Sequence, residues 1–383
     1  MTLRLRATAG ATAVAAVAAL LTITPAEARP APTPVPKGTE RLSLTADGAQ
    51  ADGDSGGAAL SADGRTTAFW SHAPNMGGDY FNALLVKDLR TGALTRVPGT
   101  RGAGGIALSA DGNLVGYSSG SRYPNPYVYD RTTGTTIHLV PTNPPGGSEF
   151  SGLDDISADG RYASYTATDR HPSSPRVLYV RELSTGTDTM VTPPDATDRY
   201  TYTSGGSLSG NGRKVLFKVT RKDDPAPSHA YVRDLGDGSV RQLDVKPDGT
   251  PSADGAVPVQ LSADGRHAAF TSSATDLVPG GTGAEQHSYV RDLRTGTTRL
   301  VGEAGDTALA LSPDGRKLLV RRGSGLHLID ARNGRSRYVA PAGSTATDGA
   351  LDRHGKAAVF ASSAADLVPD DTNNAQDVFL RRW

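Results

Sequence analysis

Leu261-Ser262-Ala263-Asp264-Gly265-Arg266 is one copy of a phrase that occurs seven times along the 383-residue chain and decides its fold. A short apolar run follows each copy. The copies begin at Ser61, Ser109, Ser157, Ser209, Ser262, Ser312 and Asp352. Successive copies start 40 to 53 residues apart, and a period of this length is typical of a repeat protein.

Each repeat reads as four short strands, and the fifth copy shows them best. Its predicted strands are Val259–Leu261, Arg266–Thr271, His287–Leu293 and Thr297–Val301. Tight turns rich in Asp, Thr and Gly separate the first strand from the second and the third from the fourth. No segment after the predicted signal peptide has a helical period. The sequence therefore predicts an all-β protein built from seven four-stranded antiparallel sheets.

A large apolar residue stands five positions after the glycine of every turn. These residues are Phe69, Tyr117, Tyr165, Phe217, Phe270, Val320 and Phe360. Stacked sheets need such a layer between them, so we expect this column to pack between neighbouring sheets.

The two ends of the chain complement each other. The seventh repeat ends at Trp383, directly after its third strand, while Thr39–Leu44 reads as a fourth strand with no repeat of its own. Residues 39–44 are therefore predicted to complete the last sheet, which closes the ring and removes an exposed edge.

The Ser-(Ala/Pro)-Asp-Gly-(Arg/Lys) turn occurs together with a Tyr-Val-x-Asp-Leu strand such as Tyr289–Leu293. Ser312-Pro313-Asp314-Gly315-Arg316-Lys317 is a representative turn. Over residues 39–383 the chain resembles the WD-repeat-like β-propellers of the TolB type. This resemblance implies a single seven-bladed β-propeller domain, whereas TolB pairs a six-bladed propeller with an N-terminal α/β domain.

The N-terminus has the features of a secretory signal. Arg4 and Arg6 precede an Ala-rich apolar stretch, and Ala26-Glu27-Ala28 fits a signal-peptidase site. We expect residues 1–28 to be a signal peptide, residues 29–38 a Pro-rich leader and residues 39–383 the propeller. A membrane anchor is the alternative, although the apolar stretch is short for a span.

Composition narrows the classes of partner. The chain has 40 basic and 40 acidic residues and no cysteine, which excludes disulfides, thiolate metal sites and a cysteine nucleophile. Without a basic cluster that could follow a phosphate backbone, we expect no nucleic-acid partner. We also expect a secreted monomer with no membrane span once the signal is removed.

Antiparallel order places the long connections of all repeats on one face of the ring. Variable loops on a rigid scaffold commonly carry binding residues, so we expect ligand binding on that face and at the mouth of the central channel. The candidate residues are Trp70, His72, Tyr80, Tyr123, Phe150, Asp154, Asp155, Arg199, Tyr200 and Tyr202. The alternative is that each merely packs its own loop. Because adjacent strand residues point to opposite faces, we expect Asp154 and Asp155 not to act as a pair.

Gly53-Asp54-Ser55-Gly56-Gly57 matches the nucleophile segment of trypsin-like proteases. A trypsin-like enzyme needs a histidine upstream, and the first histidine of this chain is His72. We therefore interpret the segment as a flexible Gly-rich loop before the first strand.

The sequence has residues for two kinds of metal site, a calcium loop and a histidine centre. Oxygen ligands at Asp371, Asn373 and Asp377 suit Ca²⁺, and a structural calcium ion is the only cofactor that the sequence suggests. Some TolB-like propellers that cleave pectate fragments as lyases hold a metal with channel histidines. The eight histidines here are scattered, so we expect no such centre.

Three functions fit this sequence. The first is an exported scaffold that binds a protein, peptide or glycan through the variable-loop face without catalysis. The second is an extracellular hydrolase or lyase that acts at the channel mouth. The third, by resemblance to TolB, is a component of cell-envelope assembly. A propeller can serve all three, because a fold does not fix a function.

Overall fold

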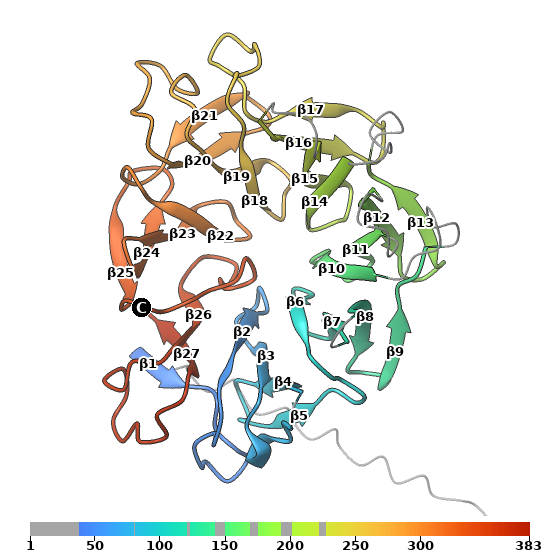
Figure 1. Cartoon of the computed structure of the whole chain (residues 1–383), viewed down its shortest axis with the longest axis vertical. Coiled ribbons are helices and arrows are strands. Elements are labelled where there is room, and N and C mark those ends of the chain that lie inside the picture. Colours follow the sequence, from blue (N-terminus) through green and yellow to red (C-terminus); the bar gives the residue numbers. More distant parts are fainter. Residues whose placement is uncertain are drawn as a thin grey trace, which may run out of the picture. The chain divides into compact units, whose positions relative to one another are not determined.

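Seven antiparallel β-sheets, the blades, follow one another around a central channel (Figure 1). The structure is a computed structural model, and it describes residues 38–79, 81–120, 123–141, 150–168, 175–192, 201–221 and 227–383. The predicted signal peptide lies outside these residues. The predicted seven-bladed β-propeller is confirmed. Within the described ranges, no helix is long and apolar enough to cross a membrane.

The first six blades have four strands each, in chain order. Blades 1 to 3 consist of β2 (Ser55–Leu60), β3 (Thr66–Ser71), β4 (Ala83–Asp88) and β5 (Leu94–Arg96); β6 (Gly104–Leu108), β7 (Leu114–Ser119), β8 (Asn125–Asp130) and β9 (Thr135–His138); and β10 (Phe150–Ile156), β11 (Tyr162–Thr168), β12 (Val177–Glu182) and β13 (Thr187–Met190). Blades 4 to 6 consist of β14 (Thr201–Leu208), β15 (Lys214–Arg221), β16 (His229–Asp234) and β17 (Val240–Gln242); β18 (Val257–Leu261), β19 (His267–Ser272), β20 (His287–Asp292) and β21 (Thr297–Leu300); and β22 (Thr307–Leu311), β23 (Lys317–Arg322), β24 (Gly325–Asp330) and β25 (Ser336–Ala340). One short 3-10 helix, η1 (Pro74–Met76), lies between β3 and β4.

Blade 7 joins the two ends of the described chain. Its strands are β26 (Ala357–Ser362), β27 (Asp377–Arg382) and β1 (Gly38–Arg41), and β1 pairs antiparallel with β27 from Gly38 opposite Arg382 onward. The Leu42 N–H donates to the Val378 carbonyl at 2.7 Å and extends this pairing. The predicted closure by the N-terminal strand is confirmed; β1 begins one residue earlier and ends three residues earlier than expected.

The recurring phrase forms a turn that is stabilised by its own side chains. In blade 5 the Ser262 hydroxyl donates to Asp264 and accepts the His267 N–H at 2.8 Å. Asp264 also accepts the Arg266 N–H, at 2.9 Å. Gly265 has a φ of +63°, a conformation that favours glycine. The motif recurs because its serine and aspartate side chains accept hydrogen bonds from backbone N–H groups. Without these acceptors, the N–H groups would lose their hydrogen bonds to water on folding and gain none in return.

These turns also connect the blades around the channel. One backbone hydrogen bond joins each turn to the turn of the next blade. Seven such bonds form a complete cycle around the channel. The cycle passes through Ala62, Ala110, Ala158, Gly210, Ala263, Pro313 and Arg353, which we call the collar. Its hydrogen bonds are 2.7–3.1 Å long.

The predicted apolar column lies between neighbouring blades. Phe69, Tyr165, Phe217, Phe270 and Val320 have no exposed surface, and Tyr117 and Phe360 are almost as buried. Aromatic residues of the third strands stack on most of them, as Phe270 does on Tyr289 with ring centroids 5.3 Å apart. The prediction of inter-sheet packing is confirmed.

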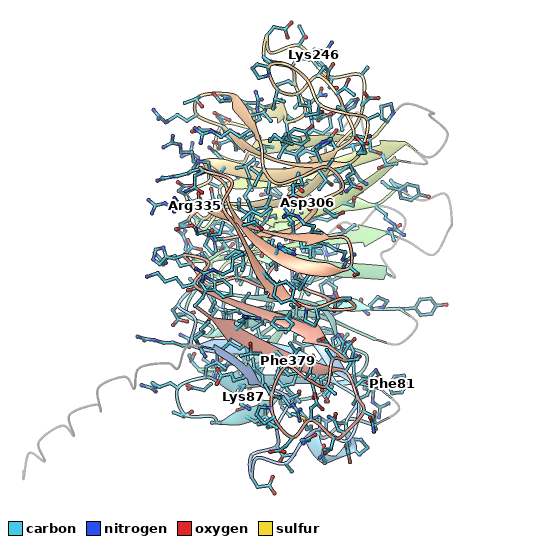
Figure 2. All side chains as sticks on the ribbon, turned by 90° about the vertical axis from the view of Figure 1, so that its left-hand side faces the viewer. Phe81, Lys87, Lys246, Asp306, Arg335 and Phe379 are labelled. Carbon is cyan, nitrogen blue, oxygen red and sulfur yellow. The ribbon has the colours of Figure 1, made fainter. Side chains whose placement is uncertain are left out.

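The two faces of the ring differ. The short turns lie on one side, the turn face, and the long connections lie on the other, the loop face. Figure 2 shows Arg335 and Phe81 on opposite sides of the ring, which are the turn face and the loop face respectively.

Candidate functional site

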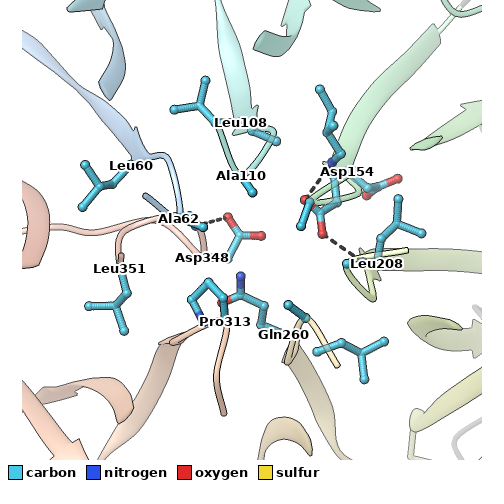
Figure 3. A pocket seen from close by; sticks show the side chains of 18 of the residues that line it. Leu60, Ala62, Leu108, Ala110, Asp154, Leu208, Gln260, Pro313, Asp348 and Leu351 are labelled. Carbon is cyan, nitrogen blue, oxygen red and sulfur yellow. Dashed lines mark hydrogen bonds between the residues drawn. The ribbon is translucent and has the colours of Figure 1, made fainter. Parts of the chain in front are cut away.

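The central channel contains a cavity of about 80 Å³ next to the collar. Collar residues and the ends of the innermost strands line it, and three aspartates, Asp154, Asp155 and Asp348, are its only acidic lining residues in the described part of the chain. Figure 3 shows the Asp348 carboxylate near the middle of this cavity, with the Gln260 side chain directed toward it. The sequence placed candidate binding residues at the loop-face mouth, whereas this cavity lies at the end of the channel where the turns meet.

A β-bulge brings Asp154 and Asp155 to the same cavity. The register of β10 against β11 shifts between Leu153 and Asp155, so Asp154 has no direct partner on β11. A bulge breaks the strict alternation of strand side chains. Both residues line one cavity, while their carboxylates bind different partners, Thr166 and Leu208. The expectation that they do not act as a pair stays a prediction.

The Asp155 carboxylate connects two blades. One oxygen accepts the N–H of Leu208 in blade 4 at 2.8 Å, and the other accepts the N–H of Ile156 at 2.7 Å. Side chains at the same place in later blades do the same: Ser207 accepts from Leu261, and Gln260 accepts from Leu311. Asp155 therefore has a structural role in addition to its place in the cavity wall.

Asp154 is held differently. It accepts a hydrogen bond from the Thr166 hydroxyl at 2.8 Å. Gly206, with a φ of +117°, lies against it, and a Cβ there would come within 2.8 Å of the Asp154 Cβ. The glycine thus leaves room for the aspartate beside the channel.

Burial raises the pKa of all three carboxyl groups. Asp154 and Asp155 are half-buried and Asp348 is exposed to the channel, but the channel wall surrounds all three and removes most of the bulk solvent. Burial, opposed by the Thr166 hydrogen bond and reinforced by the charges of Asp155 and Asp348, raises the pKa of Asp154 to about 8. Burial and the charge of Asp348 raise the pKa of Asp155 to about 7, and burial also raises the pKa of Asp348. Such shifts are common at functional sites, although structural carboxylates show them too.

Trp70 and His72 form a second cluster, at the loop-face end of blade 1. Their rings meet edge to face with centroids 5.5 Å apart, and His72 is exposed. Trp70 lies over Gly56 and Gly57 of the neighbouring strand, where a Cβ on Gly57 would be only 2.4 Å from the indole nitrogen. The two glycines therefore provide the space in which the half-buried indole packs against β2.

The Gly-rich segment is not a flexible loop, and that interpretation is wrong. Ser55 begins β2, is fully buried, and donates its hydroxyl hydrogen to the Ser71 hydroxyl at 2.8 Å. The glycines serve to seat Trp70.

The other predicted binding residues are spread over several blades. Tyr123 is half-buried after β7, and Tyr202 lies on β14 with the Arg176 guanidinium 5.3 Å from its ring centroid. Tyr80, Arg199 and Tyr200 lie outside the described residues, as does the side chain of Phe150. The structure brings together two pairs of the predicted residues, Trp70 with His72 and Asp154 with Asp155.

Arg41 lies between the acids of the predicted calcium loop. Its guanidinium is 2.9 Å from Asp371 and 3.3 Å from Asp377, and both acids are largely buried. Asn373 donates to Asp377 at 3.1 Å and to the Ala51 carbonyl at 2.9 Å. A calcium ion here would have to compete with the positive charge that β1 supplies. Calcium binding at these residues stays a prediction.

No group of three or more His, Cys, Asp or Glu side chains in the described ranges is arranged to hold a metal ion. The sequence predicts no histidine metal centre in the channel, and this stays a prediction.

Sequence reasoning missed Asp348 and Gln260 as channel residues. Asp348 precedes the degenerate seventh turn, in which Asp352 replaces the serine. Gln260 stands two positions before its turn serine, as Asp155 does, so aligning the turns would have indicated it. Asp348 stands four positions before Asp352, and the residues four positions before the other turns do not line the cavity.

Comparison with solved structures shows similarity to other propellers. An oligogalacturonate lyase in complex with manganese has a TM-score of 0.62 and 15% identity, over 90% of this chain and 92% of that chain. An oligogalacturonate lyase from Vibrio parahaemolyticus has a TM-score of 0.58 and 12% identity, over 91% of each chain. TolB from Acinetobacter baumannii has a TM-score of 0.47 and 20% identity, over 74% of this chain and 65% of that chain.

These identities are low, so the likeness to the lyases shows the fold alone. No family model matches this chain, and no curated protein sequence matches it.

Proposed function

We propose that this protein is an exported propeller that binds a protein, peptide or glycan through its loop face, without catalysis. The Trp70 platform carries this proposal. This platform consists of the half-buried Trp70 indole, packed on two glycines, and the exposed His72 imidazole in edge-to-face contact with it. Together they form an aromatic surface at a loop-bearing end of a rigid ring. The basic and apolar N-terminal segment supports export.

The size of the channel cavity favours binding on the face over binding inside the channel. Ligand pockets usually have volumes of roughly 300–1,000 Å³. The channel cavity has about 80 Å³, which suits a few water molecules but not a sugar ring or a peptide. We therefore expect the ligand to lie over the loop face.

Affinity capture tests the proposal. The purified protein would be immobilised and exposed to culture supernatant, envelope extract and a glycan panel, and the bound material identified. Trp70→Ala is expected to abolish capture of a stoichiometric ligand. Tyr338→Ala removes an exposed aromatic from β25 and serves as the control. Equal capture by wild type and Trp70→Ala would contradict the assignment of the platform.

The channel carboxylates favour a second candidate, acid–base catalysis by a hydrolase or lyase. With a pKa of about 8, Asp154 would hold a proton at neutral pH and could donate it to a substrate group that reaches the cavity. Turnover of an oligosaccharide or peptide by wild type, and its loss in Asp154→Asn with an unchanged melting temperature, would establish this function in place of the first.

A further inference from the structure

Two hollows lie side by side between blades 5 and 6, outside the channel. The first has a volume of about 460 Å³ and lies among the turns of the two blades. The second has a volume of about 700 Å³ and lies along β21. Both are lined by Arg299, Ala331 and Arg332, so they form one continuous groove. We call it the blade 5–6 groove.

The groove has an excess of positive charge. Arg299 and Arg332 are exposed, and neither side chain makes an ion pair with any residue of the described chain. Arg316 adds a third guanidinium, and its nearest carboxylate oxygen, on Asp314, is 3.9 Å away. That aspartate is also paired with His354 at 3.0 Å.

The acids of the groove are already neutralised. Asp292 accepts two hydrogen bonds from the Arg266 guanidinium, at 3.0 and 2.6 Å. Asp330 is paired with Lys317 at 2.8 Å. Neither carboxylate is left to balance Arg299 or Arg332. Two guanidinium groups, those of Arg299 and Arg332, are therefore available to an anionic partner, and a planar guanidinium suits bidentate binding of a carboxylate.

One wall of the same groove is apolar. Val278, Pro279 and Leu300 line the second hollow, and Leu300 is 42% exposed. Arg299 lines this second hollow as well, so a cationic and an apolar side chain border the same hollow. A ligand that filled the groove would need carboxylates and apolar groups within a few residues of each other.

The equivalent groove between blades 3 and 4 lacks this character. It has a volume of about 390 Å³ and contains Arg161 and Arg213. Arg161 is 3.7 Å from Glu182, and Arg213 is 3.0 Å from Asp234. Its charges are balanced, so the repeat does not by itself produce a cationic groove at this place.

We infer that the blade 5–6 groove binds an acidic peptide segment of a partner protein. Acidic side chains of the peptide pair with Arg299 and Arg332, and an apolar side chain next to them packs on Leu300. Clusters of arginine are a recurrent means of recognising acidic motifs. The apolar wall favours a peptide over an acidic polysaccharide, which has no apolar side chains to bury. This site is separate from the Trp70 platform.

Fluorescence anisotropy with a labelled peptide tests the inference. The probe is a ten-residue peptide in which Glu and Leu alternate, and a second peptide carries Gln in place of Glu. Saturable binding of the Glu peptide that weakens with added salt is expected, with binding of the Gln peptide at least about tenfold weaker. Arg299→Gln/Arg332→Gln is expected to weaken binding of the Glu peptide about tenfold or more, and Leu300→Ser several-fold.

The matched control is Arg161→Gln/Arg213→Gln, which removes the same charge from the balanced groove. This variant is expected to bind within about twofold of wild type. Circular dichroism melts of all variants show whether the fold is kept. Failure of the Glu peptide to bind, or equal weakening in both double variants, would overturn the inference. Binding of polygalacturonate but not of the peptide would overturn it as well, in favour of a glycan site.

Discussion

At the scale of single residues, the turn serines explain why the repeat is visible in the sequence. Six of the seven turns begin with a buried serine whose hydroxyl accepts the N–H of the residue that starts the next strand. No apolar residue can replace that acceptor. This requirement keeps the phrase recognisable over a chain whose loops differ greatly.

Ser262→Ala is expected to lower the free energy of unfolding by about 1–3 kcal/mol, because the buried His267 N–H loses its acceptor. Urea denaturation measures the change. Ser273→Ala, at an exposed position of the following loop, is the control and is expected to have almost no effect. Equal stability of Ser262→Ala and wild type would show that water replaces the hydroxyl.

The raised pKa of Asp154 predicts a dependence of stability on pH. Between its ordinary value of 3.8 and about 8, the folded protein keeps a proton that the unfolded chain has released. The free energy of unfolding should therefore fall as pH rises through this range. In Asp154→Asn that decline should be smaller, since asparagine does not titrate.

Urea midpoints at several pH values between about 5 and about 8.5 measure this effect. Asp237→Asn is the control, because hydrogen bonds from Ser239 lower the pKa of Asp237 and remove its titration from this range. An identical slope for Asp154→Asn and wild type would mean that the carboxyl group titrates normally in the folded protein.

At the scale of strands, the sequence predicted the elements of blade 5 to within two residues. The bulges were not predictable in the same way. The innermost strands of blades 1 to 6 each have a register shift against the second strand. A bulge depends on how the strand packs against neighbouring blades. The alternation of residues along one strand carries no information about that packing. For this reason the sequence did not show that Asp154 and Asp155 line one cavity.

Arg41 on β1 forms ion pairs with two buried acids of blade 7, so β1 stabilises that blade through a side chain as well as through strand pairing. Arg41→Met would leave Asp371 and Asp377 buried without their cation, and we expect a loss of about 3–5 kcal/mol in the free energy of unfolding. Arg65→Met, at an exposed turn position, is the control. Thermal melts compare the two variants.

The same measurement tests the calcium prediction. Because the Arg41 guanidinium already contacts both Asp371 and Asp377 where a calcium ion would bind, we expect EDTA to leave the melting temperature of the wild-type protein unchanged. A clear fall in melting temperature with EDTA, restored by added calcium, would instead support a bound ion at Asp371, Asn373 and Asp377.

At the scale of the whole ring, two devices hold the blades in a closed cycle: the collar of backbone hydrogen bonds and the pairing of β1 with β27. The sequence predicted the second device from the complementary ends of the chain. The collar could not be predicted, because its bonds join main-chain groups and are specified by no particular side chain.

Removing residues 29–44 is expected to destabilise the ring by several kcal/mol and to expose the edge of β27. Size-exclusion chromatography should then show self-association, since an unpaired edge strand can pair with another chain. Removing residues 29–36 leaves β1 intact and is the control. A monomeric and equally stable 45–383 protein would show that the collar alone maintains closure.

The pairing of Gly38 with Arg382 also sets an order of events during synthesis. Among the described strands, β1 is synthesised first and β27 last. Their long-range pairing therefore cannot form until β27 has been synthesised. Contacts between such distant segments form slowly. An early-emerging strand without its partner is vulnerable to proteases and to mispairing, and arrival of the C-terminus ends that exposure. Ring closure is therefore a late step, and it protects the edges of both β1 and β27.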